Sequence, residues 1–265
     1  MRGRVLIVAG SDSGGGAGIQ ADIKAVTALG GYAMTAVAAL TAQDTHGVRA
    51  VMPVPPDFIA LQMRLCLADI GADAVKTGML ASAEVIETVV EVLTEVGVPA
   101  LVVDPVMVAK GGQRLLEDRA LSVAIKRLLP ITTLLTPNTE EATALTGLVV
   151  ESLDDMRRAA CRLLDHGAHA VLLKGGHRHG PVVTDLLVTR GGEHAYTASR
   201  IDTAHTHGTG CTLASAIACG LAQGLDAPAA VARAHAYVQE AIRTAPGFGG
   251  GHGPLNHAHT VRPFP

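Results

Sequence analysis

The sequence predicts an α/β protein with a mainly parallel, doubly wound sheet, and three observations support this prediction. Short apolar runs alternate along the chain with longer segments of helical period, which is the pattern of β–α units. Apolar residues make up 48% of the 265 residues but aromatic residues only 2%, so small aliphatic side chains must fill the contacts between helices and sheet. The first apolar run, from Val5 to Val8, leads into the glycine-rich turn 14–18. A strand, a glycine turn and a helix in this order build a ligand crevice at the carboxyl end of a sheet.

The remaining elements follow this alternation. The strands predicted from the apolar runs are 5–9, 33–39, 74–77, 100–103, 133–136 and 170–174. The helices predicted from the intervening segments are 19–29, 56–70, 83–96, 139–146, 153–166, 212–223 and 228–244. A hairpin is expected where 182–189 and 194–199 flank the turn 190–193. No linker, internal repeat or low-complexity segment interrupts this order, so we predict a single domain that spans residues 1–265.

Composition and charge restrict the possible partners. The net charge is −3 and no basic block occurs, so we expect no nucleic-acid partner. The uncharged stretch 25–43 approaches the length of a membrane span, but Gly30 and Gly31 interrupt it, and a helix end followed by a buried strand explains it better. Four cysteines without a C-x-x-C pair indicate a reduced compartment. We therefore predict a cytoplasmic protein with small-molecule partners and no membrane contact.

The segment 206–212, Thr-His-Gly-Thr-Gly-Cys-Thr, carries the clearest chemical signal. Its two glycines leave backbone N–H groups open to an anion, and the start of the following helix adds free amides and a positive dipole end. A capped helix after a tight turn explains the same pattern without any function. The chain has neither a Gly-Lys pair nor a G-x-G-x-x-G turn, which disfavours P-loop NTPases and dinucleotide dehydrogenases. The segment thus indicates a different phosphoryl-transfer site, with Cys211 beside the reacting atoms.

Charged residues stand where three predicted strands end. Asp104 follows 100–103, Lys174 ends 170–174, and Glu141 lies in the first turn of the helix after 133–136. Because the carboxyl ends of parallel strands converge, we expect these side chains near the phosphate-binding segment. Asp104 and Glu141 are candidate ligands of Mg²⁺, directly or through water, and Lys174 is a candidate to neutralise phosphate charge. Taken singly, each also has a structural explanation, as a helix cap, a dipole partner or a solvated strand end.

Together, these motifs resemble those of the hydroxymethylpyrimidine/phosphomethylpyrimidine kinases of thiamine biosynthesis. The resemblance extends from about residue 4 to residue 259 and rests on the segments 9–22, 41–45, 76–80, 104–107, 136–138, 174–177, 206–212 and 251–257. It implies a ribokinase-like three-layer fold, in which a central, mainly parallel sheet lies between helices, and a homodimer. The implied activity is two successive phosphorylations of 4-amino-5-hydroxymethyl-2-methylpyrimidine, first to the monophosphate and then to the diphosphate, with ATP and Mg²⁺.

The resemblance also implies roles for individual residues. Substrate contacts are expected from Gln43, Met79, Val106, Asp22 and Gly10, and phosphate contacts from Lys174, Thr206, Gly208, Thr209 and Gly210. The amide of Gln43 donates and accepts in one plane, which suits the edge of a pyrimidine. Cys211 stands where many ribokinase-like sugar kinases have an aspartate base, and we expect the helix start and its amides to lower the thiol pKa. His205 replaces the asparagine typical of the family, so the resemblance does not establish the nucleotide contact at this position.

Two other functions fit the same motifs. A pyridoxal or pyridoxine kinase of the same fold would act on a ring of similar shape, and the sequence does not fix the preference between the two substrates. A non-catalytic pyrimidine sensor would keep the fold without phosphoryl transfer, although intact Asp104, Lys174 and Cys211 argue against it. Histidines two residues apart at 177/179, 205/207 and 257/259 have no third ligand at a suitable spacing, so we predict no zinc site.

Overall fold

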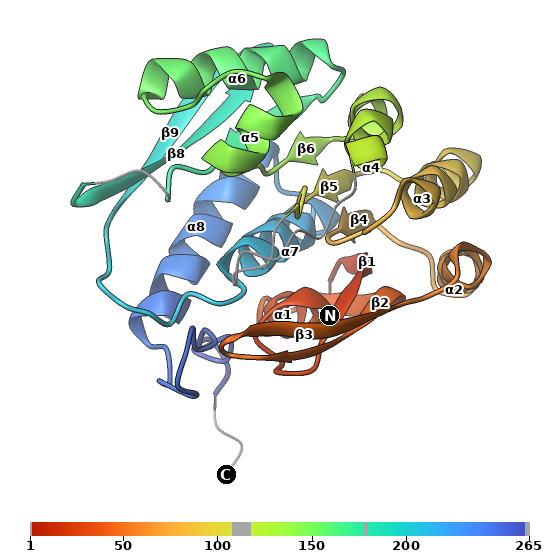
Figure 1. The fold of residues 1–265 in the computed structure, drawn as a ribbon, viewed down its shortest axis with the longest axis horizontal. Coiled ribbons are helices and arrows are strands. Elements are labelled where there is room, and N and C mark those ends of the chain that lie inside the picture. The colour runs from red at the N-terminus through yellow and green to blue at the C-terminus, as the bar shows by residue number, and fades with distance from the viewer. Residues whose placement is uncertain (1, 108–117, 177–179, 263–265) are drawn as a thin grey trace.

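The computed structural model describes residues 2–107, 118–176 and 180–262, which form one nine-stranded sheet covered by helices on both faces (Figure 1). The strand order is β3-β2-β1-β4-β5-β6-β7-β8-β9. The strands are β1 (Arg4–Asp12), β2 (Tyr32–Asp44), β3 (Gly47–Pro53), β4 (Ala74–Thr77), β5 (Leu101–Val103), β6 (Leu134–Leu135), β7 (Ala170–Leu173), β8 (Val182–Thr189) and β9 (Gly192–Ser199). From β2 to β7 neighbouring strands are parallel, whereas β3, β8 and β9 pair antiparallel at the two edges.

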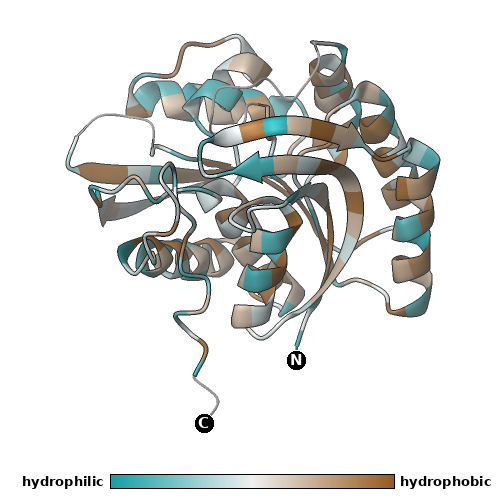
Figure 2. Cartoon of the chain, turned by 60° about the horizontal axis from the view of Figure 1, so that its bottom comes forward, coloured by the Kyte–Doolittle hydropathy of each residue, from teal (hydrophilic) through white to brown (hydrophobic). Residues whose placement is uncertain are grey.

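The parallel strands are buried on both faces, which is why they appear in the sequence as continuous apolar runs. One face is covered by α2 (Pro56–Asp69), α3 (Ala83–Val96), α4 (Asp118–Val123), α5 (Thr139–Thr146) and α6 (Leu153–Asp165). The other face is covered by α1 (Gly18–Ala28), α7 (Thr209–Ala222) and α8 (Ala227–Arg243). Figure 2 shows the outer helices with hydrophilic and hydrophobic residues on opposite sides, as expected for helices that pack on a sheet.

Helix α7 lies close to its neighbours because it is made of small residues. Nine of its residues, from Thr212 to Gly220, are buried in succession. A Cβ added at Gly220 would lie 2.8 Å from the Cβ of Ala230 on α8, so the two helices approach within the space of a missing methyl group. This close approach fixes α7 beneath the sheet, and its N-terminus is directed toward the carboxyl ends of the parallel strands.

The predicted α/β fold and hairpin are confirmed, and most element ends agree within three residues. Four short elements were not predicted: the edge strand β3, the helix α4, the π-turn over Ala124–Leu128 that continues it, and the 3₁₀ turn over Leu129–Ile131. The start of α7 was also placed too late. It begins at Thr209 rather than at residue 212, because Gly208 alone adopts the left-handed conformation, with φ of 82°, and ends the turn. No helix in the described part of the chain is long and apolar enough to cross a membrane.

Candidate active site

A cavity of about 1060 Å³ opens at the carboxyl ends of the parallel strands, between the glycine turn after β1 and the start of α7. Of the residues predicted to form the site, all but one line this cavity: Gly10, Gln43, Met79, Asp104, Val106, Glu141, Lys174, Thr206, Gly208, Thr209, Gly210 and Cys211. The exception is Asp22, which lies behind the wall. The sheet therefore brings together side chains and amides that are as far apart in the sequence as Gly10 and Cys211.

The segment before α7 leaves backbone amides unpaired at the cavity wall. Within the described residues, the N–H groups of Gly208, Gly210 and Cys211 have no hydrogen-bond partner in the backbone. The first bond of the helix runs from the Thr212 N–H to the Gly208 carbonyl, at 2.9 Å. A Cβ at Gly208 would overlap the carbonyl oxygen of Gly16, so this position requires glycine on steric grounds as well as for its positive φ. Free amides at a helix start form an anion-binding site.

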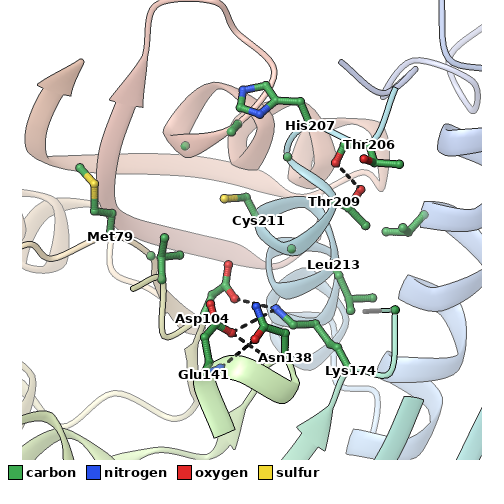
Figure 3. A pocket seen from close by; sticks show the side chains of 18 of the residues that line it. Met79, Asp104, Asn138, Glu141, Lys174, Thr206, His207, Thr209, Cys211 and Leu213 are labelled. Carbon is green, nitrogen blue, oxygen red and sulfur yellow. Dashed lines mark hydrogen bonds and ion pairs between the residues drawn. The ribbon is translucent and has the colours of Figure 1, made fainter. Parts of the chain in front are cut away.

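Two carboxylates and one ammonium group converge beside this turn. The Nζ atom of Lys174 lies 3.1 Å from Oδ1 of Asp104 and 3.9 Å from Oε2 of Glu141. Figure 3 shows these side chains clustered near Cys211. A Cβ at Gly210 would lie 3.3 Å from the Lys174 Nζ atom, which places the ammonium next to the free amides of α7. The predicted convergence of the strand-end charges is therefore present in the fold.

The charged groups of this cluster shift one another's pKa values. Burial opposes a charge on Lys174, but Asp104 and Glu141 outweigh it and raise the pKa of Lys174 to about 12. Burial and the nearby Asp104 raise the pKa of Glu141 to about 7, against the attraction of Lys174. Two carboxylates thus share one cation, and burial is the largest cause of the raised pKa of Glu141.

Glu141 also has the structural role that the sequence left open. Its Oε2 atom accepts the N–H of Asn138 at 2.8 Å, while the Asn138 side chain accepts the N–H of Glu141, which is a complete capping box at the start of α5. The remaining carboxylate oxygen and Asp104 are the candidate metal ligands. No cluster of three acidic, histidine or cysteine ligands occurs among the described residues. Two carboxylates at an open cavity fit Mg²⁺, which binds through few protein ligands and keeps several waters.

Asp22 is fully buried and holds a lysine that the sequence analysis did not identify. Both of its oxygens accept from the Nζ atom of Lys76 on β4, at 2.9 and 2.8 Å, and Oδ1 also accepts from the Ser215 hydroxyl on α7 at 2.7 Å. Lys76 rather than Asp22 borders the cavity. The expected contact between Asp22 and the substrate therefore does not fit this geometry. Burial opposes the charge of Lys76, but Asp22 outweighs it and the pKa of Lys76 is raised. Lys76 was missed because it stands inside an apolar strand run.

Cys211 lies on the cavity wall, but its expected low pKa is wrong. Burial raises the pKa of the thiol to about 12, and the charges of Asp22 and Asp104 add to this effect. Lys76 and a hydrogen bond from the Gly18 N–H act in the opposite direction but do not compensate. Free amides at a helix start lower a thiol pKa, but at Cys211 burial and the two nearby carboxylates outweigh them. The thiol is therefore neutral at physiological pH.

Gln43 is held by a hydrogen-bond network on the cavity wall between the glycine turn and His207. Asp12 accepts three backbone N–H groups of the glycine turn, and its Oδ2 atom lies 2.9 Å from Nε2 of His207. Because a carboxylate only accepts, this ring nitrogen carries the hydrogen. The side-chain amide of Gln43 lies 3.2 Å from the same nitrogen, so its oxygen must face His207 and its NH₂ group faces Thr41. The Thr41 hydroxyl in turn donates to the Ser11 carbonyl at 2.9 Å.

This network fixes the charge of Asp12 as well as the orientation of the amide. Burial opposes the charge of Asp12, but the bonds from His207 and from the glycine turn hold the pKa of Asp12 below its ordinary value. Asp12 and His207 are 195 positions apart, and neither was singled out as a site residue. Only the fold shows that the glycine turn and the segment before α7 are joined by a buried hydrogen bond.

The cavity continues beyond Lys174 into a region that the sequence analysis also missed. Its walls there are formed by the end of β9 and the following loop, by β8 and by α8, and include Val183, Asp185, Ser199, Arg200, Ile201, Asp202, Thr203, His235, Val238, Gln239 and Ile242. His205, which departs from the family pattern, is not among the lining residues and lies against Gly253. Of the histidine pairs, His177 and His179 lie outside the described residues.

Comparison with known proteins identifies the family. The family model for phosphomethylpyrimidine kinase matches residues 12–256. The hydroxymethylpyrimidine/phosphomethylpyrimidine kinase of Streptomyces coelicolor is 51% identical over 253 residues, which cover 96% of this chain and 93% of that protein. The thiamine biosynthesis bifunctional protein of Geobacter sulfurreducens is 52% identical over 256 residues, and the match covers 97% of this chain but only 52% of that longer protein.

Solved structures of two kinds of kinase share the fold. The phosphomethylpyrimidine kinase of Clostridium difficile superimposes with a TM-score of 0.81 at 41% identity, covering 90% of this chain and 99% of that one. The pyridoxal kinase of Staphylococcus aureus in complex with pyridoxal gives a TM-score of 0.91 at 37% identity, covering 99% and 96%. The motifs, the cavity they line and these similarities agree: the chain belongs to the phosphomethylpyrimidine kinase family and has the ribokinase-like fold expected from its sequence.

Proposed function

We propose that this chain transfers the γ-phosphoryl group of ATP to 4-amino-5-hydroxymethyl-2-methylpyrimidine and then a second phosphoryl group to the resulting monophosphate, in thiamine biosynthesis. The observation that carries the proposal is one cavity with two different ends. The charged end has Lys174 and the free amides of α7. At the other end, here called the neutral end, the Gln43 amide lines the cavity and the charges of Asp12 and Lys76 are already paired with His207 and Asp22. The relatives named for both phosphorylations support it, because they match nearly the whole chain.

The proposed chemistry needs positioning and charge more than a strong base. In the first step the hydroxymethyl oxygen attacks the γ-phosphorus, the bond to the β-phosphate oxygen breaks and ADP leaves. The hydroxyl proton passes to a phosphate oxygen or to water late in the reaction. In the second step an anionic phosphate oxygen attacks and no proton has to be removed. Lys174, together with Thr206, Gly208, Thr209 and Gly210, would hold the phosphates, and Cys211 would contact the reacting groups as a neutral thiol.

Mg²⁺ would be held by Asp104 and Glu141, in part through water. When bound, it would neutralise phosphate charge and orient the phosphates. Two carboxylates and a single ammonium group meet in this cluster, which supports the assignment. The carboxylate oxygens of these two residues fit Mg²⁺ better than a metal that prefers nitrogen or sulfur ligands.

The neutral end would bind the pyrimidine. Met79 and Val106 line this end with apolar surface, and a Cβ at Gly10 would lie 2.5 Å from the Met79 Cε atom, so Gly10 leaves room for that side chain. With its orientation set by His207 and Thr41, the Gln43 amide offers one donor and one acceptor to an aminopyrimidine edge. Asp22 would contribute only indirectly, by fixing Lys76.

Phosphorylation of pyridoxal is the second candidate function. The specific observation in its favour is the similarity to pyridoxal kinase structures, with TM-scores of 0.90 and 0.91 at 32% and 37% identity. The higher identity to phosphomethylpyrimidine kinases, up to 51% over nearly full length, favours the pyrimidine. Competition between the two substrates in one assay separates the functions.

We further propose that the chain acts as one domain, in the cytoplasm and as a homodimer. Exposed apolar side chains gather on the edge hairpin and on α2, where Leu40 pairs with Met52 and where Phe58, Leu61 and Leu65 are exposed. A second copy of the chain would cover this face. Light scattering of the purified protein tests the dimer, since a monomeric mass at micromolar concentration would rule it out.

An ATP-coupled assay with the hydroxymethylpyrimidine tests the main proposal. We expect ADP formation with the alcohol and, separately, with the monophosphate, and loss of both on removal of Mg²⁺ with EDTA. Turnover of pyridoxal but not of the pyrimidine would support the second candidate function in place of the first. The absence of ATP consumption with either ring would favour a non-catalytic sensor.

A further inference from the structure

The C-terminal segment 249–257, here named the strap, has no role in the chemistry described above. It runs back across the molecule beside the tip of the β2–β3 hairpin (Figure 1). The His252 N–H donates to the Thr45 carbonyl at 2.7 Å, and the Gly251 N–H donates to the Thr45 hydroxyl at 3.2 Å. Nδ1 of His252 lies 3.1 Å from the Ala204 carbonyl oxygen. The strap thus joins the hairpin to the loop that precedes α7.

The strap also supports the phosphate-binding segment from behind. The His207 N–H donates to the Gly253 carbonyl at 3.1 Å, and His207 pairs with Pro254 as an isolated parallel bridge. Pro254 lies against the glycine turn as well, because a Cβ at Gly16 would be 3.1 Å from the Cβ of Pro254. The strap therefore contacts both the glycine turn and the segment before α7, which meet at Gly208.

The end of the strap reaches the first turn of α7 through His257. This side chain is buried, and its backbone carbonyl accepts the Tyr237 hydroxyl of α8 at 2.6 Å. Its Nε2 atom lies 2.9 Å from the Thr212 hydroxyl, which lies 2.7 Å from the Gly208 carbonyl. The hydroxyl has a single hydrogen and the carbonyl only accepts, so Thr212 donates to Gly208 and accepts the N–H of His257.

The direction of these bonds does not change in the physiological range. Burial, helped by the charge of Lys24, lowers the pKa of His257 to about 4, so the ring is neutral and carries its hydrogen on Nε2. Gly208, at the end of this chain of bonds, has a positive φ and is the residue at which the chain turns into α7. A change at Thr212 or His257 is therefore transmitted to the position of the free amides.

We propose that His257 and Thr212 are positioning residues for phosphate binding: they hold the Gly208 carbonyl, and with it the first turn of α7, at the cavity. The inference rests on the proposed function only in assigning phosphate to this turn. Neither side chain lines the cavity, so both act through Gly208 rather than by contact with a ligand.

Four variants test the proposal, with the Kd for MgADP from calorimetry, the KM values for ATP and for the pyrimidine, and the melting temperature. Thr212→Val removes the hydroxyl at constant shape, and His257→Leu removes the donor. Both are expected to weaken MgADP binding and raise the KM for ATP about tenfold, with the pyrimidine KM changed less than twofold. Thr212→Ser restores the hydroxyl and should restore MgADP affinity.

Asn256→Ala is the matched control. It removes a different anchor of the strap, the bond from the Asn256 amide to the Thr244 hydroxyl at 3.2 Å, and should lower the melting temperature without changing MgADP affinity. Equal MgADP affinity in Thr212→Val and wild type, no recovery in Thr212→Ser, or the same loss in Asn256→Ala would each overturn the positioning role. If Thr212→Val does not fold, the comparison of His257→Leu with Asn256→Ala at matched melting temperature decides. A wild-type protein that binds no MgADP would instead overturn the proposed function itself.

Discussion

The two ends of the cavity are built from different groups. The end near β1 and β2 has apolar side chains at Met79 and Val106 and the amide of Gln43. Its charged lining residues, Asp12 and Lys76, are already paired with His207 and Asp22. The end near α7 combines Asp104, Glu141 and Lys174 with free backbone N–H groups. Neutral groups distinguish ligands by shape and by hydrogen-bond pattern, whereas charges and amides bind any phosphate in the right place. The contrast suggests that substrate choice and phosphoryl transfer depend on separate residues.

The ion pair between Lys76 and Asp22 lies behind both ends, and its loss should have the largest effect. Asp22→Ala leaves the fully buried ammonium unpaired and is expected to lower the free energy of unfolding by about 3–5 kcal/mol. The double variant Lys76→Met/Asp22→Leu replaces the pair by apolar groups and should lose much less. Urea unfolding of the three proteins measures the difference. Equal losses in the single and the double variant would mean that unpaired charge is not the cause.

Lys174→Ala tests the charged end. Because this ammonium lies between the carboxylates and the free amides, we expect the rates of both phosphorylations to fall by about 10²–10³-fold. Single-turnover rates measured with the alcohol and with the monophosphate check this expectation. Lys126→Ala, a change at an exposed residue outside the cavity, is the control and should leave both rates unchanged. A loss confined to one step would break the assignment of Lys174 to the phosphates common to both.

Gln43→Leu tests the neutral end. If the amide pairs with the pyrimidine edge, the variant leaves ring polar groups unpaired, which should cost about 1–3 kcal/mol of binding. The loss should appear in the KM for the pyrimidine, while the KM for ATP should barely change. An unaltered pyrimidine KM in Gln43→Leu would show that Gln43 is not part of the substrate site. Parallel changes in both KM values would contradict the separation of the two ends.

Cys211 lies between the two ends of the cavity, and its substitution should have the smallest effect of these changes on the rates of phosphorylation. Because its thiol is neutral, with a pKa raised to about 12, Cys211→Ala is expected to slow both steps by a similar factor of about tenfold. A much larger loss in the first step would show that the thiol takes the hydroxyl proton in the complex. Alkylation of Cys211 by iodoacetamide, followed by peptide mass spectrometry, should rise with pH through 10 without a plateau, since the thiolate increases up to the pKa.

The sequence predicted what depends on local pattern. Apolar runs identified β4 and β8 to the residue, and strand ends located Asp104 and Lys174 because parallel strands converge at one edge. The edge strand β3 was not predicted because Arg49 interrupts its apolar residues and Pro53 ends it, so only the three-residue run 50–52 marks it. Lys76 and the bond between Asp12 and His207 escaped because they depend on contacts between distant segments. The prediction of a low pKa for Cys211 was wrong because the sequence shows the helix start but not the burial of the thiol or the carboxylates around it.

The hydrogen bond between Asp12 and His207 has a consequence for the time at which the site forms. The partners are 195 positions apart, and those of the bond between Ser215 and Asp22 are 193 apart, so both close very long loops. The last strand of the sheet ends at Ser199, before α7 begins at Thr209. The segment that carries the free amides is therefore synthesised after every described strand of the sheet. The apolar residues of β1 and β5 that α7 covers stay uncovered until that segment has been made, so the candidate site and the second face of the sheet are completed together.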